Sequence, residues 1–388
     1  MRICVVYDCL YPHTVGGAER WYRNLSERLA ADGHEVTYVT MRQWPGDEVD
    51  SPTGVRVRPV SPRMGLYTRD GRRRILPPIV FGVGMLAHLL RRGRRYDVVH
   101  MASFPYFSVL AAAIARPLGG FRLVVDWFEV WSRDYWREYL GPAGRIGWWV
   151  QKLCARVRQR AFCFSQLHAR RLQEIGGNVD AVLEGAYSGP LEPPEPQAAE
   201  PVVVFAGRHI PEKRVPALVP AIATALKRTP NLRCDIYGDG PERPVVERRI
   251  AEEQVGDAIT SHGFVAADEI DTALRRAACM ILPSRREGYG LIVVEAAAVG
   301  TPSVVVAGPD NAATELVESG RNGVIAPSAS ADDLAGAIAA VLDAGMSLRE
   351  STAEWFGENA YRLSLESSLD RVVRSYRGGS ERRRRNSA

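Results

Sequence analysis

The stretch Pro283-Ser-Arg-Arg-Glu-Gly-Tyr-Gly-Leu-Ile-Val-Val-Glu295 places two glutamates eight residues apart around a Gly-x-Gly turn. An apolar run, Cys279 to Leu282, precedes the stretch, and an alanine-rich segment, Ala296 to Val299, follows it. This order predicts a strand, a loop and a helix, with the glycines at the start of the helix. Free N–H groups at a helix start favour anions, and glycine lets a ligand approach the backbone closely. The stretch therefore predicts a turn that binds phosphate groups.

The two glutamates are expected to face one crevice at the carboxyl end of the strand, where open parallel sheets bind ligands. Glu287 belongs to the loop, and Glu295 lies just over one turn into the helix. Two carboxylates suit the hydroxyls of a sugar ring and of a ribose, and the turn amides suit a diphosphate between them. Alternatively, both glutamates are solvated residues at a helix start without a ligand. Motifs elsewhere in the chain are needed to distinguish these two interpretations.

Length and composition describe a soluble protein with two domains. The chain has 388 residues, which is too long for one ordinary core, with 46% hydrophobic and 24% charged residues. The six cysteines are scattered, lie mostly in apolar runs and show no Cys-x2-Cys spacing. We therefore expect reduced core cysteines in a cytoplasmic protein. No Asp-x-Asp or histidine-rich cluster indicates a metal site.

Charge is divided unevenly along the chain. Residues 1–190 carry a net charge of +10, and residues 191–376 carry −9. A basic first half favours contact with an anionic partner or a membrane surface. Arginine makes up 47 of the 50 basic residues, and this compositional bias accounts for a basic surface equally well.

Strand and helix patterns alternate on both sides of a proline-rich linker, which predicts an α/β fold with two separately wound parallel sheets. Strands are expected at Ile3–Tyr7, Glu35–Thr40, Val55–Val60, Val98–Met101, Arg122–Val125, Val202–Ala206, Arg233–Tyr237, Ala258–Ser261, Met280–Leu282 and Ser303–Val306. Helices are expected at Ala18–Ala31, Val215–Thr229, Arg243–Val255 and Ala331–Ala344. We predict a first domain over residues 1–187, a linker over 188–200, a second domain over 201–354, a C-terminal helix over 355–376 and a disordered basic tail over 377–388.

Two further motifs follow the first strand of each half. Gly16-Gly17-Ala18-Glu19 opens the first helix, where paired glycines allow a ligand to approach. Ala206-Gly-Arg-His-Ile-Pro-Glu-Lys213 leaves the first strand of the second half, so that Arg208 and Lys213 can converge on a diphosphate.

Together these motifs resemble those of retaining glycosyltransferases with the GT-B fold, in particular glycosyltransferase family 4. In the family signature that Glu287 and Glu295 resemble, the first glutamate meets the donor sugar and the second meets the ribose. The Gly-Gly-Ala-Glu segment is similar to a family loop beside the donor phosphates and the acceptor. The Arg208 and Lys213 pair closely matches the family's Gly-Arg-x4-Lys pattern.

Weaker matches and departures complete the resemblance. The turn at Gly238 resembles one that lines the nucleotide pocket, and Gly263-Phe264-Val265 resembles a segment whose backbone meets the base. Asn311 to Glu315 occupies the place of a Gly-rich loop ending in Pro-Glu, without its glycines or proline. In the family a second histidine, near the donor sugar, often stands two residues after the one that corresponds to His100. In this chain that position is Ala102. Either His100, Asp126 or another residue therefore contacts the sugar in its place, or the sugar is held differently.

The resemblance implies a GT-B fold, with two Rossmann-like domains facing across a cleft and the last helix crossing back to the first domain. It implies a metal-independent hexosyltransferase that retains the anomeric configuration, with cations stabilising the leaving diphosphate. No cofactor is expected beyond a UDP- or GDP-linked sugar as co-substrate, and the acceptor is a glycan, a lipid-linked molecule or a small molecule. The catalytic candidates are Glu287, Arg208, Lys213, His100 and Asp126. The donor-binding candidates are Gly16, Gly17, Arg208, Lys213, Gly238, Phe264, Val265, Glu287, Gly288, Tyr289, Gly290, Leu291 and Glu295.

Alternatives stay open at this point. The protein could instead catalyse another GT-B reaction, such as epimerisation or hydrolysis of a nucleotide sugar. A catalytically silent binding protein is the second alternative. Nucleic acid is not an expected partner, because a basic tail is ordinarily disordered. The segment Ile75–Leu90, bordered by arginines, is too short to span a bilayer and is either a sheet-covering helix or a contact with anionic lipid. The expected location is therefore the cytoplasm, including a peripheral position at the inner face of the membrane.

Overall fold

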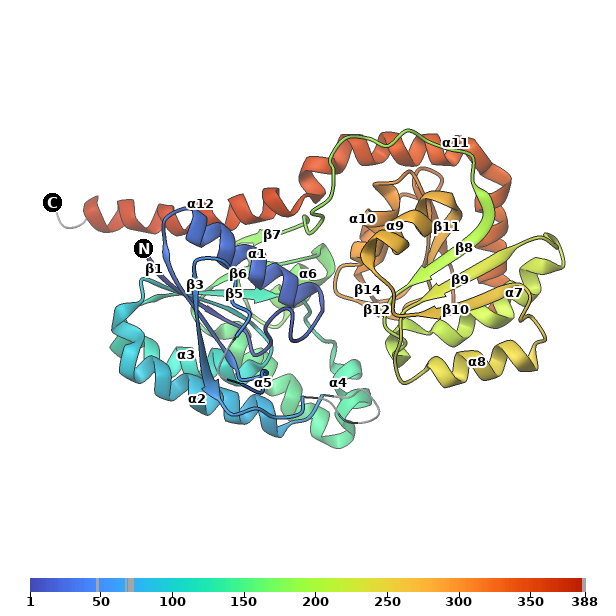
Figure 1. The fold of residues 1–388 in the computed structure, drawn as a ribbon. Coiled ribbons are helices and arrows are strands. Elements are labelled where there is room, and N and C mark those ends of the chain that lie inside the picture. Colours follow the sequence, from blue (N-terminus) through green and yellow to red (C-terminus); the bar gives the residue numbers. More distant parts are fainter. Residues whose placement is uncertain (47–48, 67, 69–72, 386–388) are drawn as a thin grey trace. The chain divides into compact units, whose positions relative to one another are not determined.

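The computed structural model describes residues 1–46, 49–66, 68 and 73–385, with side chains up to Tyr376. The chain forms two α/β units (Figure 1). Unit 1 takes in most of residues 1–184 together with the C-terminal helix α12, and unit 2 is Gly185–Leu365. The predicted linker, residues 188–200, has no helix or strand before Glu200.

Unit 1 is built on a sheet that has seven parallel strands within the described residues. Their order is β3 (Val55–Ser61), β2 (Glu35–Met41), β1 (Arg2–Val6), β4 (Val98–Ala102), β5 (Arg122–Trp127), β6 (Arg160–Cys163) and β7 (Ala181–Val182). The winding direction reverses between β1 and β4, so the carboxyl ends of these two strands form the position at which such sheets bind ligands.

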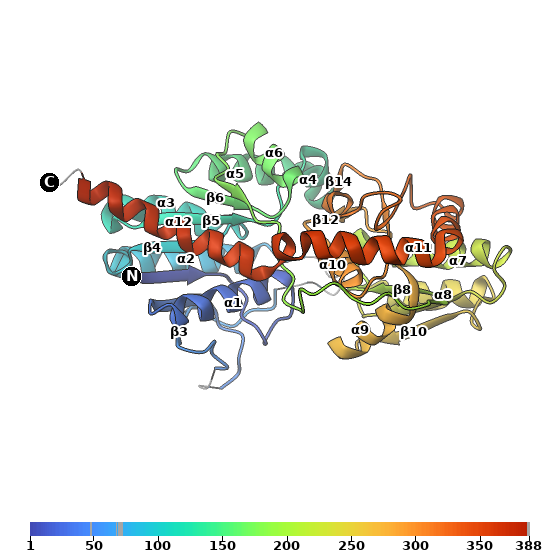
Figure 2. The same cartoon turned by 90° about the horizontal axis from the view of Figure 1, so that it is seen from above.

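Helices cover both faces of this sheet. They are α1 (Gly17–Ala31), α2 (Leu76–Arg92), α3 (Tyr106–Gly119), α4 (Arg133–Leu140), α5 (Gly144–Arg156), α6 (Gln166–Glu174) and α12 (Leu365–Arg385). Helices α2, α3 and α5 lie on one face, and α1 and α12 lie on the other (Figures 1 and 2). Glycine allows α2 to approach α3 closely, because a Cβ at Gly82 would lie 2.5 Å from the Cβ of Phe107.

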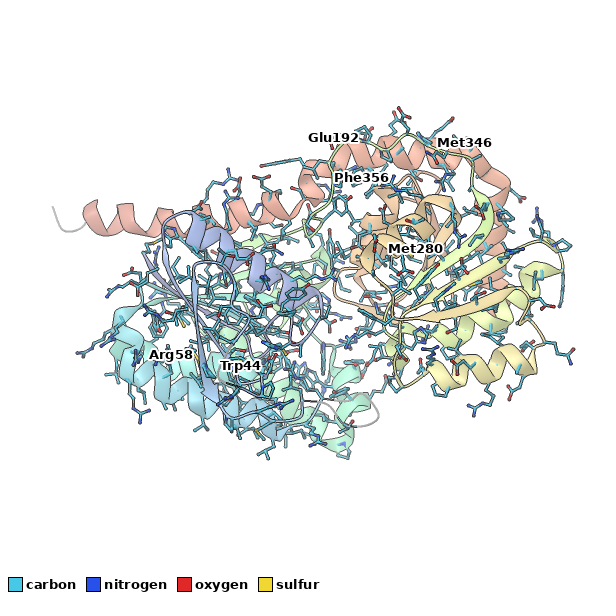
Figure 3. The ribbon with its side chains drawn as sticks, in the orientation of Figure 1. Trp44, Arg58, Glu192, Met280, Met346 and Phe356 are labelled. Carbon is cyan, nitrogen blue, oxygen red and sulfur yellow. The ribbon has the colours of Figure 1, made fainter. Side chains whose placement is uncertain are left out.

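Unit 2 is built on a second parallel sheet, with six strands within the described residues. Their order is β10 (Ile259–Gly263), β9 (Arg233–Tyr237), β8 (Glu200–Ala206), β11 (Ala277–Leu282), β13 (Ser303–Val306) and β15 (Gly323–Ala326). Apolar residues fill both faces of the central strands, and Met280 on β11 and Phe356 on α11 both belong to this core (Figure 3). The winding direction reverses between β8 and β11.

Short elements and helices surround this sheet. The helices are α7 (Leu218–Leu226), α8 (Arg243–Glu252), α9 (Ala267–Arg276), α10 (Leu291–Ala297) and α11 (Ala331–Leu363). Two two-residue strands, β12 (Arg286–Glu287) and β14 (Asp310–Asn311), pair with each other beside the main sheet.

The C-terminal part differs from the sequence prediction. The structure breaks the chain at Ser364, whose ψ of 143° is extended, and not near residue 354. Helix α11 is itself interrupted at Gly345, which has φ 54° and ψ −130°. Helix α12 then continues to Arg385, so the backbone of residues 377–385 is helical where disorder was expected, and residues 386–388 lie outside the described part. The prediction that the cysteines lie in the core is confirmed, since all six are buried, and none of them forms a disulfide.

Candidate functional site

The main candidate site lies at the carboxyl edge of the unit 2 sheet, where the loops after β8 and β11 meet. The Nζ atom of Lys213, after β8, lies 2.5 Å from Oε1 of Glu287, after β11. The backbone N–H of Arg285 donates to the carbonyl of Glu212 at 2.8 Å, which holds the two loops side by side. Arg286 adds an ion pair to Glu212 at 3.7 Å. The structure therefore brings together two motifs that are 74 residues apart in sequence.

Some charged side chains at this edge of the sheet form ion pairs, and one is exposed without a partner among the described residues. The side chains of Lys213 and Glu287 are only 20% and 10% exposed, so water screens their attraction weakly. Arg208 is exposed, and its side chain has no hydrogen bond or ion pair within the described part of the chain. A weakly screened ion pair, with an exposed guanidinium in the same loop after β8, is suited to an anionic, hydroxyl-bearing ligand.

The Gly-x-Gly turn has the backbone that the sequence requires of it. Gly290 has φ 99°, and a Cβ there would lie 2.6 Å from the Cβ of Ala313. Gly288 and Tyr289 are half-buried in this turn. Helix α10 begins at Leu291, directly after Gly290, as the predicted position of the glycines at the helix start requires.

Glu295 is the fifth residue of α10 and is half-buried. It lies near Tyr187, because burial and then the charges of Asp271 and Glu295 raise the pKa of that hydroxyl. The prediction that Glu295 lies just over one turn into the helix is confirmed.

The segment from Asn311 to Glu315 packs against the Gly-x-Gly turn. The buried side-chain amide of Asn311 donates to the carbonyls of Ser284 and Val306 at 3.1 and 2.8 Å. Its side-chain oxygen accepts from the N–H of Ala313, the residue that packs against Gly290. This supporting role of Asn311 was not predicted; its signal is a lone polar residue in the place of the expected glycines.

The loop after β9 lies beside the loop after β8. Gly238 has φ 113°, and a Cβ there would lie 1.9 Å from the carbonyl oxygen of Gly207. The N–H of Glu242 donates to the carbonyl of His209 at 2.9 Å. Burial and the nearby charge of Glu212 raise the pKa of the Glu242 carboxyl.

Phe264 and Val265 follow the next strand, β10. Phe264 is 82% exposed, whereas Val265 is half-buried against the core of unit 2. Just before them, the rings of His262 and Tyr237 stack with centroids 4.4 Å apart. Asp235 contacts His262 at 3.0 Å, and no sequence motif indicated this pair, which holds the His262 ring beside Tyr237.

In unit 1, the predicted Gly-Gly motif opens helix α1. A Cβ at Gly16 would lie 2.5 Å from an oxygen of Glu19, whereas Gly17 faces open space. Glu19 is only 8% exposed and lies in the first helical turn, where a negative charge is stabilised. The Glu19 carboxylate therefore occupies the space beside Gly16 at this helix start.

His100 and Asp126 lie in a buried network. Nε2 of His100 is 2.9 Å from Oδ1 of Asp126, and the indole of Trp21 donates to Oδ2 of Asp126 at 2.8 Å. On its other side His100 forms a hydrogen bond with the hydroxyl of Tyr376 on α12. Both His100 and Asp126 are fully buried. The catalytic role expected for them stays a prediction, and the contacts observed are those of side chains in a packed interior.

Asp8 and Arg73 form a second buried charged cluster in unit 1, which was not predicted from the sequence. Asp8 lies two residues after the end of β1, is fully buried and forms an ion pair with Arg73. The Arg73 guanidinium also lies over the Phe104 ring, 4.9 Å from its centroid. An aspartate that ends a buried apolar run was the available signal.

Neither a metal centre nor a membrane span is found in the described ranges. No group of three or more His, Cys, Asp or Glu side chains there could hold a metal ion. Likewise, no described helix combines the length and the apolar character needed to cross a bilayer.

Comparison with known proteins gives the family of both halves. Residues 15–183 match the model described as Glycosyltransferase Family 4, and residues 192–363 match the model of glycosyl transferases group 1.

Two curated relatives illustrate the similarity. The alpha-D-kanosaminyltransferase of Streptomyces kanamyceticus is 31% identical over 46% of this chain, and the match spans 45% of that protein. The chain thus covers less than half the length of that relative. The D-inositol 3-phosphate glycosyltransferase of a Nocardioides species is 27% identical, with 93% of this chain and 85% of the relative covered.

Solved structures agree on the fold. Sucrose-phosphate synthase from Thermosynechococcus elongatus superposes with a TM-score of 0.78 at 20% identity and covers 97% of this chain and 98% of its own. The Anabaena protein HepE, solved with UDP and glucose, gives 0.72 at 17% identity over 97% and 99% of the two chains. The predicted GT-B fold class is confirmed, and the chain belongs to the GT-B glycosyltransferases of family 4 and group 1.

Proposed function

We propose that the protein transfers a hexose-type sugar from a UDP- or GDP-linked donor to a glycan, lipid-linked or small-molecule acceptor, with retention at the anomeric carbon. The observation that carries this proposal is the ion pair of Lys213 with Glu287, with the exposed Arg208 in the same loop as Lys213. Family membership and the structure of the similar HepE with UDP and glucose support a nucleotide sugar as donor.

Each side chain at the edge of the unit 2 sheet has a task in this reaction. Arg208 and Lys213 bind the diphosphate and stabilise the charge that develops on it as it leaves. When the diphosphate draws the Lys213 ammonium toward itself, the Glu287 carboxylate is released to accept hydrogen bonds from hydroxyls of the donor sugar. After the exchange the ammonium pairs with the diphosphate and the sugar hydroxyls solvate the carboxylate, so neither charged group lacks a partner in a site that water screens weakly.

The remaining candidates bind the nucleotide. Glu295 accepts hydrogen bonds from the ribose hydroxyls, and the backbone at Phe264 and Val265 meets the base. Glycines in the turn at Gly288 and Gly290 allow the diphosphate to approach the backbone in this proposal. The two cations Arg208 and Lys213 supply the charge that a metal ion would otherwise provide, so we propose a metal-independent reaction without a cofactor.

We place the enzyme in the cytoplasm, including a peripheral position at the inner face of the membrane. Six buried, free cysteines suit a reducing compartment.

A thermal-shift panel of UDP, GDP and their sugars, followed by assays with two variants, tests the proposal. One nucleotide series is expected to raise the melting temperature, because a ligand that binds only the folded state stabilises it. Lys213→Ala is expected to weaken nucleotide diphosphate binding about tenfold or more, since it removes a charge-assisted hydrogen bond. Glu287→Gln is expected to keep nucleotide binding and lose sugar transfer. Arg228→Ala, at an exposed arginine paired with Asp343, is the matched control.

Several outcomes would contradict the proposal. If no nucleotide sugar in the panel raises the melting temperature, the enzyme assignment fails, and the alternative of a catalytically silent protein is favoured. Release of free sugar or of an epimer as the main product assigns hydrolysis or epimerisation instead. Full activity in both variants removes the site assignment, and an inverted product in NMR spectra removes retention.

A further inference from the structure

Helices α2, α3 and α5 of unit 1 expose a set of large apolar side chains, which we call the apolar face. Its members are 38–68% exposed and are Leu76, Ile79, Val83 and Leu90 on α2, Ile114 and Leu118 on α3, and Ile146, Trp149 and Leu153 on α5. Along each helix they recur at spacings of three, four or seven residues, which places them on one side of that helix. These helices therefore carry apolar stripes that the core does not bury.

The three stripes belong to one layer of the fold. Helix α2 packs on α3, and α3 packs on α5, on the same face of the unit 1 sheet (Figures 1 and 2). The hydroxyl of Tyr106 on α3 donates to Gln151 on α5 at 2.8 Å, which ties these two helices together. Scattered exposed apolar residues are normal on a protein surface, whereas a set shared by three adjacent helices marks an interaction surface.

The same helices carry only positive charge. None of α2, α3 and α5 contains an aspartate or a glutamate. Their cations, with those directly after them, are Arg91, Arg92, Arg94, Arg95, Arg116, Arg145, Lys152, Arg156 and Arg158. Within the described part of the chain, none of these nine has a carboxylate partner. On α1, by contrast, Arg23 pairs with Glu27 and Arg28 pairs with Asp370.

The unpaired cations gather at the ends of the helices. Arg58 (Figure 3), Arg92 and Arg95 line one hollow at the amino edge of the sheet. The same hollow is lined by Arg2, which pairs with Asp97, and by Arg56 and Glu35, which pair with each other. The pKa of the Arg116 guanidinium is lowered by burial and by the charge of Arg158, as expected where cations face each other without an anion. The nine cations on and after these helices thus have no carboxylate partner within the described residues, whereas Arg2 and Arg56 at the same hollow do.

We propose that the apolar face docks this protein on the surface of an anionic lipid bilayer. The apolar side chains enter the interface, the arginines bind the phosphate headgroups, and Trp149 lies at the headgroup level that tryptophan favours. A second copy of the chain is a poorer occupant, because a symmetric dimer through this face would bring two sets of unpaired cations together. The proposal concerns a surface away from the predicted donor site and does not depend on sugar transfer.

Co-sedimentation of the full chain with lipid vesicles tests this proposal. We expect binding to vesicles of mixed phosphatidylglycerol and phosphatidylcholine, little binding to phosphatidylcholine alone, and weakening as salt rises. The triple variant Ile146→Ser, Trp149→Ser and Leu153→Ser is expected to lose about tenfold or more of its affinity for the mixed vesicles. A second variant, Ile79→Ser with Val83→Ser, tests a different helix in case the first does not fold.

Matched controls use residues outside the face. Tyr361→Ser removes an exposed aromatic side chain of α11, and Arg228→Gln removes a paired arginine, so both are expected to bind vesicles like the wild type. Unchanged melting curves show that the variants are folded. Equal binding to neutral vesicles, no binding at all, or wild-type binding by both serine variants would overturn the proposal. Self-association that the triple variant abolishes would assign the face to a second copy instead.

Discussion

His88 on α2 is buried, with Nε2 2.9 Å from the hydroxyl of Tyr96. Burial, and then the charges of Arg58 and Arg92, lower its pKa from 6.5 to about 4. The unfolded chain therefore takes up a proton near pH 6.5 that the folded protein refuses until about pH 4. The contribution of His88 to stability is complete above pH 6.5 and is lost as the pH falls toward 4.

We predict that the free energy of unfolding decreases by about 2 kcal/mol through this group between pH 7 and pH 4.5. His88→Gln keeps a polar side chain without this titration, so its urea unfolding curves are expected to show a flatter pH dependence over that range. His13→Gln, at an exposed histidine, is the control and should keep the wild-type slope. Equal slopes for wild type and His88→Gln would show that His88 carries no such linkage.

At the same scale, the sequence located the charged residues but not their supports. Lys213 and Glu287 stood out because each belongs to a motif with fixed spacing, and the structure pairs them. Asn311 and the pair His262 and Asp235 did not stand out, because their roles depend on residues far away in the chain. Local patterns cannot identify such partners.

Among the elements, most strands were predictable from their apolar runs, including the four-residue β13, whereas several short elements were not. Most of β8 and all of β9 lie where the alternation placed them. The four-residue strands β6 and β15 and helix α9, which buries only Ala273 and Leu274, carry weak periodic signals and were missed. The break at Ser364 was missed because no glycine or proline marks it.

The turn before α10 gives a prediction at the element scale. Gly290→Ala must place a Cβ at φ 99° and against Ala313, so we expect a loss of about 2 kcal/mol or more in stability together with weaker nucleotide binding. Urea unfolding and the thermal-shift panel measure the two effects.

A second glycine provides the matched control for that change. Gly336 lies inside α11, is exposed, and would place a Cβ in open space. Gly336→Ala is therefore expected to stabilise the protein by about 0.5–1 kcal/mol, with nucleotide binding unchanged. If the two substitutions have the same effect, the backbone of the Gly-x-Gly turn is not the cause.

For the molecule as a whole, helix α12 returns the end of the chain to unit 1. Its Asp370 accepts a hydrogen bond from Arg28 at 2.7 Å, and its Arg371 donates to the carbonyl of Val182 at 2.9 Å. The carbonyls of Ser375 and Tyr376 accept from Arg160 and Arg122. The sequence indicated a helix here but could not show its contacts, because the partners lie some 190 to 340 positions away in the chain.

Tyr376 tests how far this attachment stabilises each unit. Tyr376→Phe leaves His100 Nδ1 buried without its hydroxyl partner, which costs about 1–3 kcal/mol. Because the whole network belongs to unit 1, hydrogen exchange is expected to speed up in β4, β5 and α12, while amides of unit 2 keep their protection. Tyr361→Phe, which removes an exposed hydroxyl from α11, should change neither unit. Faster exchange throughout unit 2 in Tyr376→Phe would instead mean that the two units unfold as one.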